Sequence, residues 1–146
     1  MSEIRHRVFV YGTLRSGGSN HHRMAGAVLV APASVRGRLY RIDWYPGVVL
    51  DAESDAVVGE VYDVDGSMLA ALDEYEGSEY RRVEATAALE DGNHVAALIW
   101  EWRLEVDEAR RIESGDWLEA MPSQRSRSRK TSGGEDPRPP ISGFAG

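Results

Sequence analysis

RVFVYGTLRSGGSN, residues 7–20, begins as a strand and ends as a loop. The β-branched and aromatic run over residues 8–11 predicts a buried strand, and the glycines that follow predict a loop at its carboxyl end. Gly12, Gly17 and Gly18 allow the backbone to approach a ligand, so several N–H groups can converge on one anion. An ordinary connection between a strand and a helix explains the same spacing, and both interpretations stay open.

Two nucleotide-binding motifs resemble this loop in spacing, and its residues argue against both. A P-loop requires a lysine after its second glycine, where this chain has Gly18. A dinucleotide fingerprint requires three glycines in the order G-x-G-x-x-G. Here Thr13 and Leu14 occupy positions that would have to form a tight turn, which argues against the motif. We therefore expect neither a triphosphate nor a dinucleotide here.

The composition indicates one globular domain. The chain has 146 residues, of which 42% are hydrophobic, enough for a substantial core but too few for a separate cofactor domain. We expect a cytoplasmic protein without a membrane segment, because no apolar run approaches about 18 residues and the N-terminus lacks the layout of a signal peptide. Without cysteine, the chain has no thiolate nucleophile, disulfide or thiolate zinc site.

Charge divides the chain into an acidic body and a basic tail. The net charge is −7, with about −10 in residues 1–120 and about +3 in residues 121–146. An acidic body argues against nucleic-acid binding, which relies on neutralising phosphates. We expect residues 1–120 to form the domain and residues 121–146, rich in Ser, Arg, Gly and Pro, to be a disordered extension.

The remaining patterns predict six strands and few helices. After the first strand, we expect strands at residues 34–42, 48–50, 57–64, 80–89 and 94–102, a helix at 68–76, and turns at 45–47 and 90–93. Residues 107–121 begin with a polar helical turn, and Trp117 and Leu118 attach this segment to the body. The expected fold class is α+β, a small mixed β-barrel or curled sheet with short flanking helices.

The helix at residues 68–76 carries the most informative side chain. Leu69, Leu72 and Glu76 share one stripe, so the Glu76 carboxylate lies on the buried face in the last turn. Burial and the helix dipole both raise its pKa, which suits a general acid or base working near neutrality. A salt bridge to Arg81 or Arg82 would instead lower the pKa, and this alternative is open.

Other candidate residues have a functional and a structural interpretation. Glu60 lies among apolar neighbours in the sequence. It is either a functional carboxylate or an inward-facing glutamate that pairs with an arginine. Trp100 and Trp102 share one strand face and either pack in the core or form the wall of a ligand site. The adjacent His21 and His22 point in different directions, so we expect no metal site.

Four short motifs in order resemble the gamma-glutamylcyclotransferase-like family. They are YGTLR at residues 11–15, YPG at 45–47, GEVY at 59–62, and LDEYEG at 72–77 followed by YRR at 80–82. The likeness covers about residues 7–118, and the closing IESGDWL at 112–118 resembles small bacterial members, including those similar to gamma-glutamylamine cyclotransferase.

The resemblance implies a compact mixed β-barrel and a cofactor-free enzyme that releases 5-oxoproline from a small gamma-glutamyl amide or amine. Glu76 matches the family's catalytic glutamate. Tyr11, Gly12, Thr13, Leu14 and Arg15 match its substrate-binding loop. The Arg15 side chain either adds positive charge to this site or points outward. In this chemistry the substrate's own α-amine is the nucleophile. The protein therefore holds the substrate in a folded conformation and supplies a base for the ammonium proton and an acid for the leaving amine.

Two other classes of function remain open at this stage. The same pocket could belong to a noncatalytic module that binds a small carboxylate or a peptide end, because fold does not fix function. A purely structural domain with Glu76 in a salt bridge is the third class. A carboxylate on an apolar helix stripe favours the enzyme, since a binding module does not need it. The sequence does not predict the oligomeric state.

Overall fold

The computed structural model describes residues 4–121. Apart from Met121, the disordered extension expected over residues 121–146 lies outside the described residues. The elements follow in the order β1 (Arg5–Val10), η1 (His21–Met24), β2 (Val28–Arg41), β3 (Pro46–Leu50), β4 (Ala56–Asp65), α1 (Gly66–Glu76), β5 (Tyr80–Leu89), β6 (His94–Trp102), η2 (Glu108–Arg110) and α2 (Trp117–Ala120). None of the helices described is long and apolar enough to cross a membrane.

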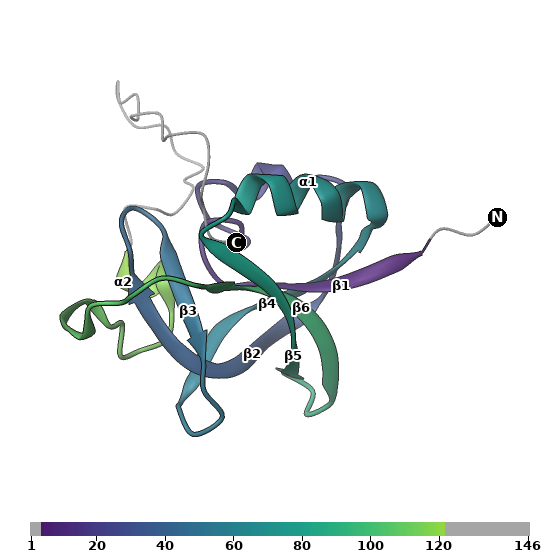
Figure 1. The fold of residues 1–146 in the computed structure, drawn as a ribbon. Helices are drawn as coiled ribbons and strands as arrows, with labels where there is room; N and C mark the ends of the chain where they lie inside the picture. Colours follow the sequence, from purple (N-terminus) through teal and green to yellow (C-terminus); the bar gives the residue numbers. More distant parts are fainter. Residues whose placement is uncertain (1–3, 122–146) are drawn as a thin grey trace, which may run out of the picture.

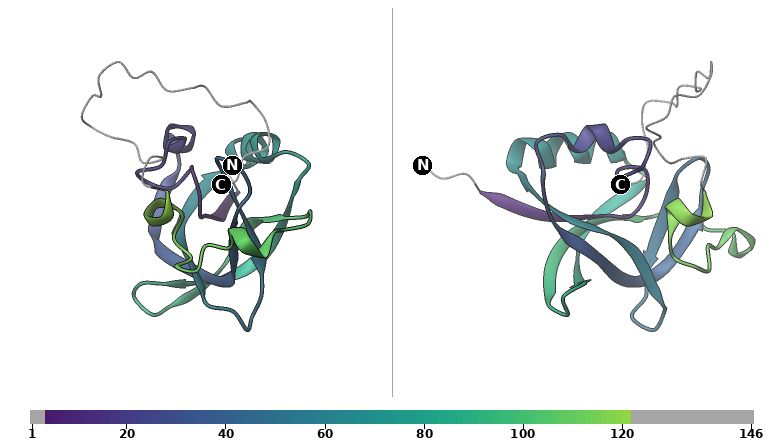
Figure 2. Two further views of the ribbon diagram at one scale, coloured as in Figure 1. Left: turned by 90° about the vertical axis from the view of Figure 1, so that its left-hand side faces the viewer. Right: turned by 180° about the vertical axis from the view of Figure 1, so that it is seen from behind.

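Five of the six strands close into a barrel, which Figures 1 and 2 show from three sides. The strand order is β3-β2-β4-β1-β6-β5, and the pairing of β2 with β5 closes the ring. The barrel is mixed, because β1 and β6 run parallel while the other pairs are antiparallel. β3 extends the sheet beside β2. The small mixed β-barrel expected from the sequence is confirmed.

β1 is central to the core. Val8, Phe9 and Val10 are fully buried, because β1 lies between β4 and β6 while α1 packs across β1 and β4 (Figure 1). Asp65 is the N-cap of α1, and its side chain accepts a hydrogen bond from the Met68 N–H at 2.9 Å. The predicted stripe of α1, formed by Leu69, Leu72 and Glu76, is buried against the barrel. The loop that follows β1 lies on the same side of the barrel as α1 (Figure 1).

β2 is longer than the sequence pattern predicts. It begins at Val28 instead of residue 34. A bulge between Leu29 and Ala31 interrupts the pairing with β4, and Val28, Leu29 and Val30 are all exposed. Because a bulge breaks the two-residue alternation of a strand, the pattern carries no strand signal over this part.

The expected turn at residues 45–47 is displaced towards the N-terminus. Pro46 and Gly47 are the first residues of β3, and the turn is closed earlier, where the Ile42 and Asp43 N–H groups donate to the Tyr45 carbonyl. Proline is tolerated as the first residue of an edge strand. The Trp102 side chain packs directly over Gly47, which explains why a residue without Cβ stands in this strand.

Gly59 in β4 marks the closest approach of two strands. A Cβ atom there would lie 2.1 Å from the Val10 carbonyl oxygen and 2.7 Å from Phe9 Cζ. We therefore expect Gly59→Ala to lower the free energy of unfolding by about 3 kcal/mol, because neither β1 nor the Phe9 ring can move without disturbing the core. Urea denaturation measures this change.

Gly66→Ala is the matched control for this prediction. A Cβ atom at Gly66, the first residue of α1, meets nothing within 4 Å, so this variant should be as stable as the wild type or slightly more stable. Equal stability of the two variants would contradict the prediction.

Candidate active site

Glu76 is fully buried in the last turn of α1. Neither carboxyl oxygen has a hydrogen-bond partner within residues 4–121. The two arginines that could have paired with it bind elsewhere: Arg82 Nη1 lies 2.6 Å from Asp73 Oδ2, and Arg81 Nη2 lies 3.1 Å from Glu101 Oε1. The alternative of a salt bridge to Glu76 is therefore wrong, and its burial, expected from the stripe, is confirmed.

Burial raises the pKa of Glu76 well above its ordinary value, and the negative charge of Asp73 raises it further. The carboxylate form is disfavoured because it loses its hydration without gaining a cation or a donor. Glu76 also occupies the C-terminal end of a helix, where the dipole opposes a negative charge. The side chain therefore holds its proton more strongly than an exposed glutamate, as an acid that works near neutrality must.

Asp73 lies outside the helix stripe formed by Leu69, Leu72 and Glu76. It stands three positions before Glu76, a spacing that brings side chains together on a helix. One Asp73 oxygen accepts from Trp100 Nε1 at 2.9 Å and the other from Arg82 Nη1. Its negative charge is thereby fixed near Glu76. The i, i+3 spacing was a usable signal for this neighbour.

The negative charge of Glu76 raises the pKa of three tyrosine side chains from different parts of the chain. Burial, and then the charge of Glu76, raise the pKa of Tyr11. For Tyr80, burial raises the pKa most, followed by the charges of Tyr11 and Glu76. For Tyr75, burial again raises the pKa most, and Glu76 adds to the effect. The charge of Glu76 therefore acts on three weakly acidic tyrosine hydroxyls.

The Tyr11 hydroxyl is committed to the barrel. It donates to the Trp100 carbonyl at 2.7 Å and accepts from the Val48 N–H at 3.3 Å, so it ties β3 and β6 together at the end of β1. The Tyr80 hydroxyl likewise donates to the Pro46 carbonyl at 2.7 Å. These hydrogen bonds fix two of the tyrosine side chains on which the charge of Glu76 acts.

Residues 12–20, which we call the glycine loop, fold back on themselves. The Arg15 N–H donates to the Gly12 carbonyl at 3.1 Å, the Gly18 N–H to the Arg15 carbonyl at 2.7 Å, and the Asn20 N–H to the Thr13 carbonyl at 2.9 Å. The N–H groups of Gly12 and Leu14 take part in none of these loop hydrogen bonds. The N–H groups of Arg15 and Gly18 are thus used within the loop.

The loop meets α1 next to Glu76. Thr13 is fully buried, and a polar contact from its side chain lowers the pKa of Tyr75, against the larger effect of burial. Arg23 of η1 lies over the Tyr75 ring, 4.3 Å from its centre, a cation–π arrangement. The structure therefore brings Tyr11 and Thr13 to the Glu76 end of α1.

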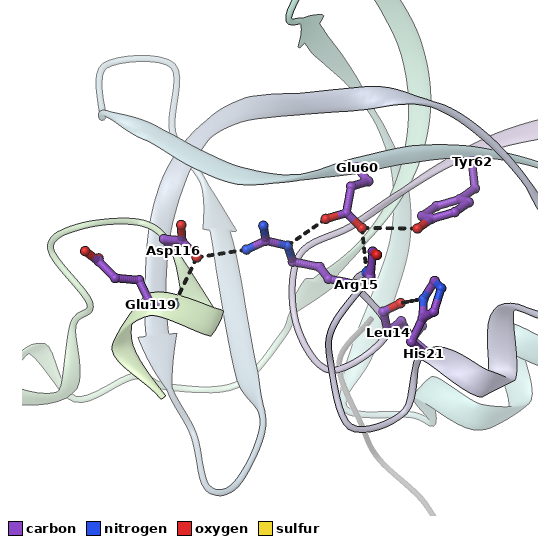
Figure 3. A network of polar contacts seen from close by, with 8 residues as sticks. Leu14, Arg15, His21, Glu60, Tyr62, Asp116 and Glu119 are labelled. Atoms are coloured by element: carbon purple, nitrogen blue, oxygen red, sulfur yellow. Dashed lines mark hydrogen bonds and ion pairs between the residues drawn. The ribbon is translucent and has the colours of Figure 1, made fainter. Parts of the chain in front are cut away.

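Arg15 and Glu60 form an ion pair beside this loop, as Figure 3 shows. Arg15 Nε lies 3.0 Å from Glu60 Oε2, and Arg15 Nη1 lies 2.9 Å from Asp116 Oδ1. The side chain of Arg15 is 12% exposed, so the interpretation of an outward-pointing arginine is wrong. For Glu60, the alternative of an arginine-paired carboxylate is confirmed.

The two tryptophans of β6 are core residues with satisfied N–H groups. Trp100 donates to Asp73, and Trp102 Nε1 donates to the Glu105 carbonyl at 3.2 Å. Trp102 also packs edge-on against Tyr80, with ring centres 5.1 Å apart. The packing interpretation is confirmed for both.

The histidine pair does not form a chelate. His21 Nδ1 lies 2.9 Å from the Leu14 carbonyl oxygen and so belongs to the packing of the glycine loop, while His22 is exposed. Within residues 4–121, no group of three His, Cys, Asp or Glu side chains could hold a metal ion.

Comparison with known proteins identifies the family. The model of the family "Gamma-glutamyl cyclotransferase, AIG2-like" matches residues 8–119. The chain belongs to this family. It is 38% identical over 116 residues to the gamma-glutamylcyclotransferase family protein YtfP of Escherichia coli, covering 77% of this chain and 96% of that protein.

Two further relatives agree with this family assignment. The gamma-glutamylaminecyclotransferase of Bos taurus is 38% identical over 96 residues, 57% of this chain and 56% of that protein. The crystal structure of an uncharacterized Pyrococcus horikoshii protein superimposes with a TM-score of 0.66 and 31% identity, covering 81% of this chain and 94% of that chain. The fold and the family expected from the sequence are both confirmed.

Replacing Glu76 by glutamine should change how stability depends on pH. Because the pKa of Glu76 is raised above its ordinary value of 4.5 in the folded protein, the folded state keeps a proton that the unfolded state releases. The wild type therefore loses stability as pH rises above 4.5 towards the raised pKa. Glutamine does not titrate, so the stability of Glu76→Gln relative to wild type should grow over this interval, measured by urea denaturation.

Glu74→Gln is the control, because Glu74 is exposed on the same helix. A stability difference that grows equally with pH in both variants would contradict the role of burial at Glu76.

Proposed function

We propose that this member of the family is a cofactor-independent cyclotransferase that releases 5-oxoproline from a small gamma-glutamyl amide or amine. Glu76 acts as its general acid and base. One observation carries the proposal: a fully buried carboxyl without a hydrogen-bond partner in the described part of the chain, at the point where α1 meets the glycine loop. A buried polar group without a partner requires an explanation, and proton transfer to a substrate supplies one.

The reaction needs no nucleophile from the protein. The α-nitrogen of the gamma-glutamyl group attacks its own side-chain carbonyl, which forms a C–N bond and closes a five-membered ring. The C–N bond to the leaving amine then breaks. Holding the substrate in a folded conformation is therefore a main contribution of the enzyme. The absence of cysteine in the chain is compatible with this chemistry.

Glu76 handles the protons of both steps. As a carboxylate it takes one proton from the α-ammonium, which makes the nitrogen nucleophilic, and it returns this proton to the leaving nitrogen. The ring nitrogen also gives up its second proton, which the released amine takes up, so that the products are the lactam and an ammonium ion. One group can do both only if its pKa lies near the working pH, and burial together with Asp73 shifts the pKa of Glu76 in that direction. The side chain is thereby suited to both halves of the reaction.

The glycine loop is the proposed binding element for the glutamyl part of the substrate. The Gly12 and Leu14 N–H groups, which are not used within the loop, would hold the α-carboxylate or the oxygen that becomes negative during ring closure. Tyr11 and Thr13, both fully buried, belong to the same stretch. Tyr11 is held in place because its hydroxyl both donates and accepts a hydrogen bond.

The function is tested by 5-oxoproline release, measured by mass spectrometry, from a panel of gamma-glutamyl amino acids and gamma-glutamyl amines. We expect turnover by the wild type and by Glu74→Gln. Glu76→Gln should lose about 10²- to 10⁴-fold in rate, the usual contribution of a general acid or base. Glutamine preserves the size of the side chain, so the variant should still bind substrate.

Two results would count against the proposal. Undiminished release by Glu76→Gln would remove Glu76 from the mechanism. The second is that the wild type releases 5-oxoproline from none of the compounds, while adding them raises its melting temperature. This result would favour a noncatalytic module that binds small carboxylates.

A further inference from the structure

We propose that Arg15 is a positioning residue rather than a substrate ligand. With Glu60 and Asp116 it forms a clamp that holds the glycine loop in the conformation presented to the substrate. This inference rests on the proposed function, in which the loop receives the glutamyl group, and it reassigns the one charged side chain of the predicted substrate-binding stretch.

The charge balance of the clamp argues against a direct role of Arg15 in binding an anion. Its guanidinium faces two carboxylates, with Nε at 3.0 Å from Glu60 and Nη1 at 2.9 Å from Asp116 (Figure 3). Two negative charges against one positive charge leave the cluster net negative. Charge-assisted hydrogen bonds in a partly buried setting are among the stronger polar contacts in proteins. A substrate carboxylate would therefore find the positive charge of Arg15 already compensated.

Glu60 holds the main chain of the loop as well as the Arg15 side chain. Its Oε1 atom accepts from the Ser16 N–H at 2.9 Å and from the Tyr62 hydroxyl at 3.2 Å, while Oε2 accepts from Arg15. One buried carboxylate on the rigid strand β4 thus fixes two consecutive loop residues.

Arg15 is also the residue shared by the two turns of the loop. Its N–H donates to the Gly12 carbonyl, and its carbonyl accepts from the Gly18 N–H. Gly18 has no room for a side chain, because a Cβ atom would lie 2.4 Å from the Thr13 carbonyl oxygen. A displacement of Arg15 would therefore move both turns, including the Gly12 and Leu14 N–H groups proposed to bind substrate.

The third member of the clamp comes from the end of the domain. Asp116 is the N-cap of α2, and its Oδ1 atom accepts from the Glu119 N–H as well as from Arg15. Trp117, which follows, is fully buried. The preceding Gly115 carbonyl accepts from the Val58 N–H of β4 at 2.9 Å. Both ends of the clamp are thus anchored on the barrel, and the C-terminal segment becomes part of the binding machinery.

Asp116→Asn tests the clamp with little other disturbance. Asparagine is as good an N-cap as aspartate, so α2 keeps its cap while the contact with Arg15 loses its negative charge. Asp51→Asn is the matched control. Asp51 likewise pairs with an arginine, at 3.2 Å from Arg38 Nε, and accepts from a backbone N–H two residues on. The two aspartate side chains are similarly exposed, at 30% and 33%.

Two readouts distinguish positioning from general stability. The first is amide hydrogen exchange at Gly18 and Asn20, whose N–H groups close the loop. The second is the KM for the gamma-glutamyl substrate. A variant that is merely less folded shows a lower kcat at unchanged KM, whereas a displaced binding loop raises KM. We expect Asp116→Asn and Arg15→Lys to speed exchange at both amides about tenfold and to raise KM.

A double variant and the control complete the test. Arg15→Lys combined with Asp116→Asn should behave like Arg15→Lys alone, because both changes break the same contact. Asp51→Asn should leave loop exchange and KM unchanged. The clamp proposal is overturned if Asp116→Asn shows the same amide exchange in the loop and the same KM as Asp51→Asn. If the wild type turns over no substrate, the proposed function fails, and hydrogen exchange alone still decides whether the clamp orders the loop.

Discussion

Burial of the Glu76 carboxyl without a partner is the constraint on which the site depends. Removing a carboxylate from water costs several kcal/mol unless a cation or donors replace the lost hydration. In the described residues neither oxygen has such a partner, so the folded protein favours the protonated form. The cost is offset by the apolar burial of β1 and of the α1 stripe. A less tightly packed barrel would admit water, and the pKa shift would be lost.

The surrounding charges preserve this state. Arg81 and Arg82 follow α1 closely enough to reach it, and either one would lower the pKa of Glu76 by pairing with it. Glu101 and Asp73 bind these arginines instead. Asp73 then has two effects. It forms an ion pair with Arg82. Its carboxylate, which accepts a hydrogen bond from Trp100 Nε1, also raises the pKa of Glu76 further. Ion pairs on the surface thus maintain an unpaired carboxyl inside.

Local patterns were enough to predict a curled sheet or barrel, the buried stripe of α1 and the burial of Glu76, because strand alternation and the helical stripe have short periods in the sequence. The choice of a mixed barrel came from the family resemblance. The pattern failed at Val28, where the bulge removes the alternation, and at Pro46, where the tertiary contact with Trp102 decides that Pro-Gly enters a strand. The pairing of Arg15 with Asp116 spans 101 positions. No local signal predicts such a contact, so sequence reasoning left the direction of Arg15 open.

Two buried carboxylates in the described residues have opposite environments, although both lie among apolar neighbours in the sequence. Glu60 accepts hydrogen bonds from a guanidinium, a backbone N–H and a hydroxyl. The Glu76 oxygens accept none in the described residues. The difference arises from the glycine loop, which brings its arginine to β4 and not to α1. Because the clamp directs Arg15 away from Glu76, the same loop can lie beside the acid without neutralising it. The geometry of one loop therefore separates an anchoring carboxylate from one free to exchange protons.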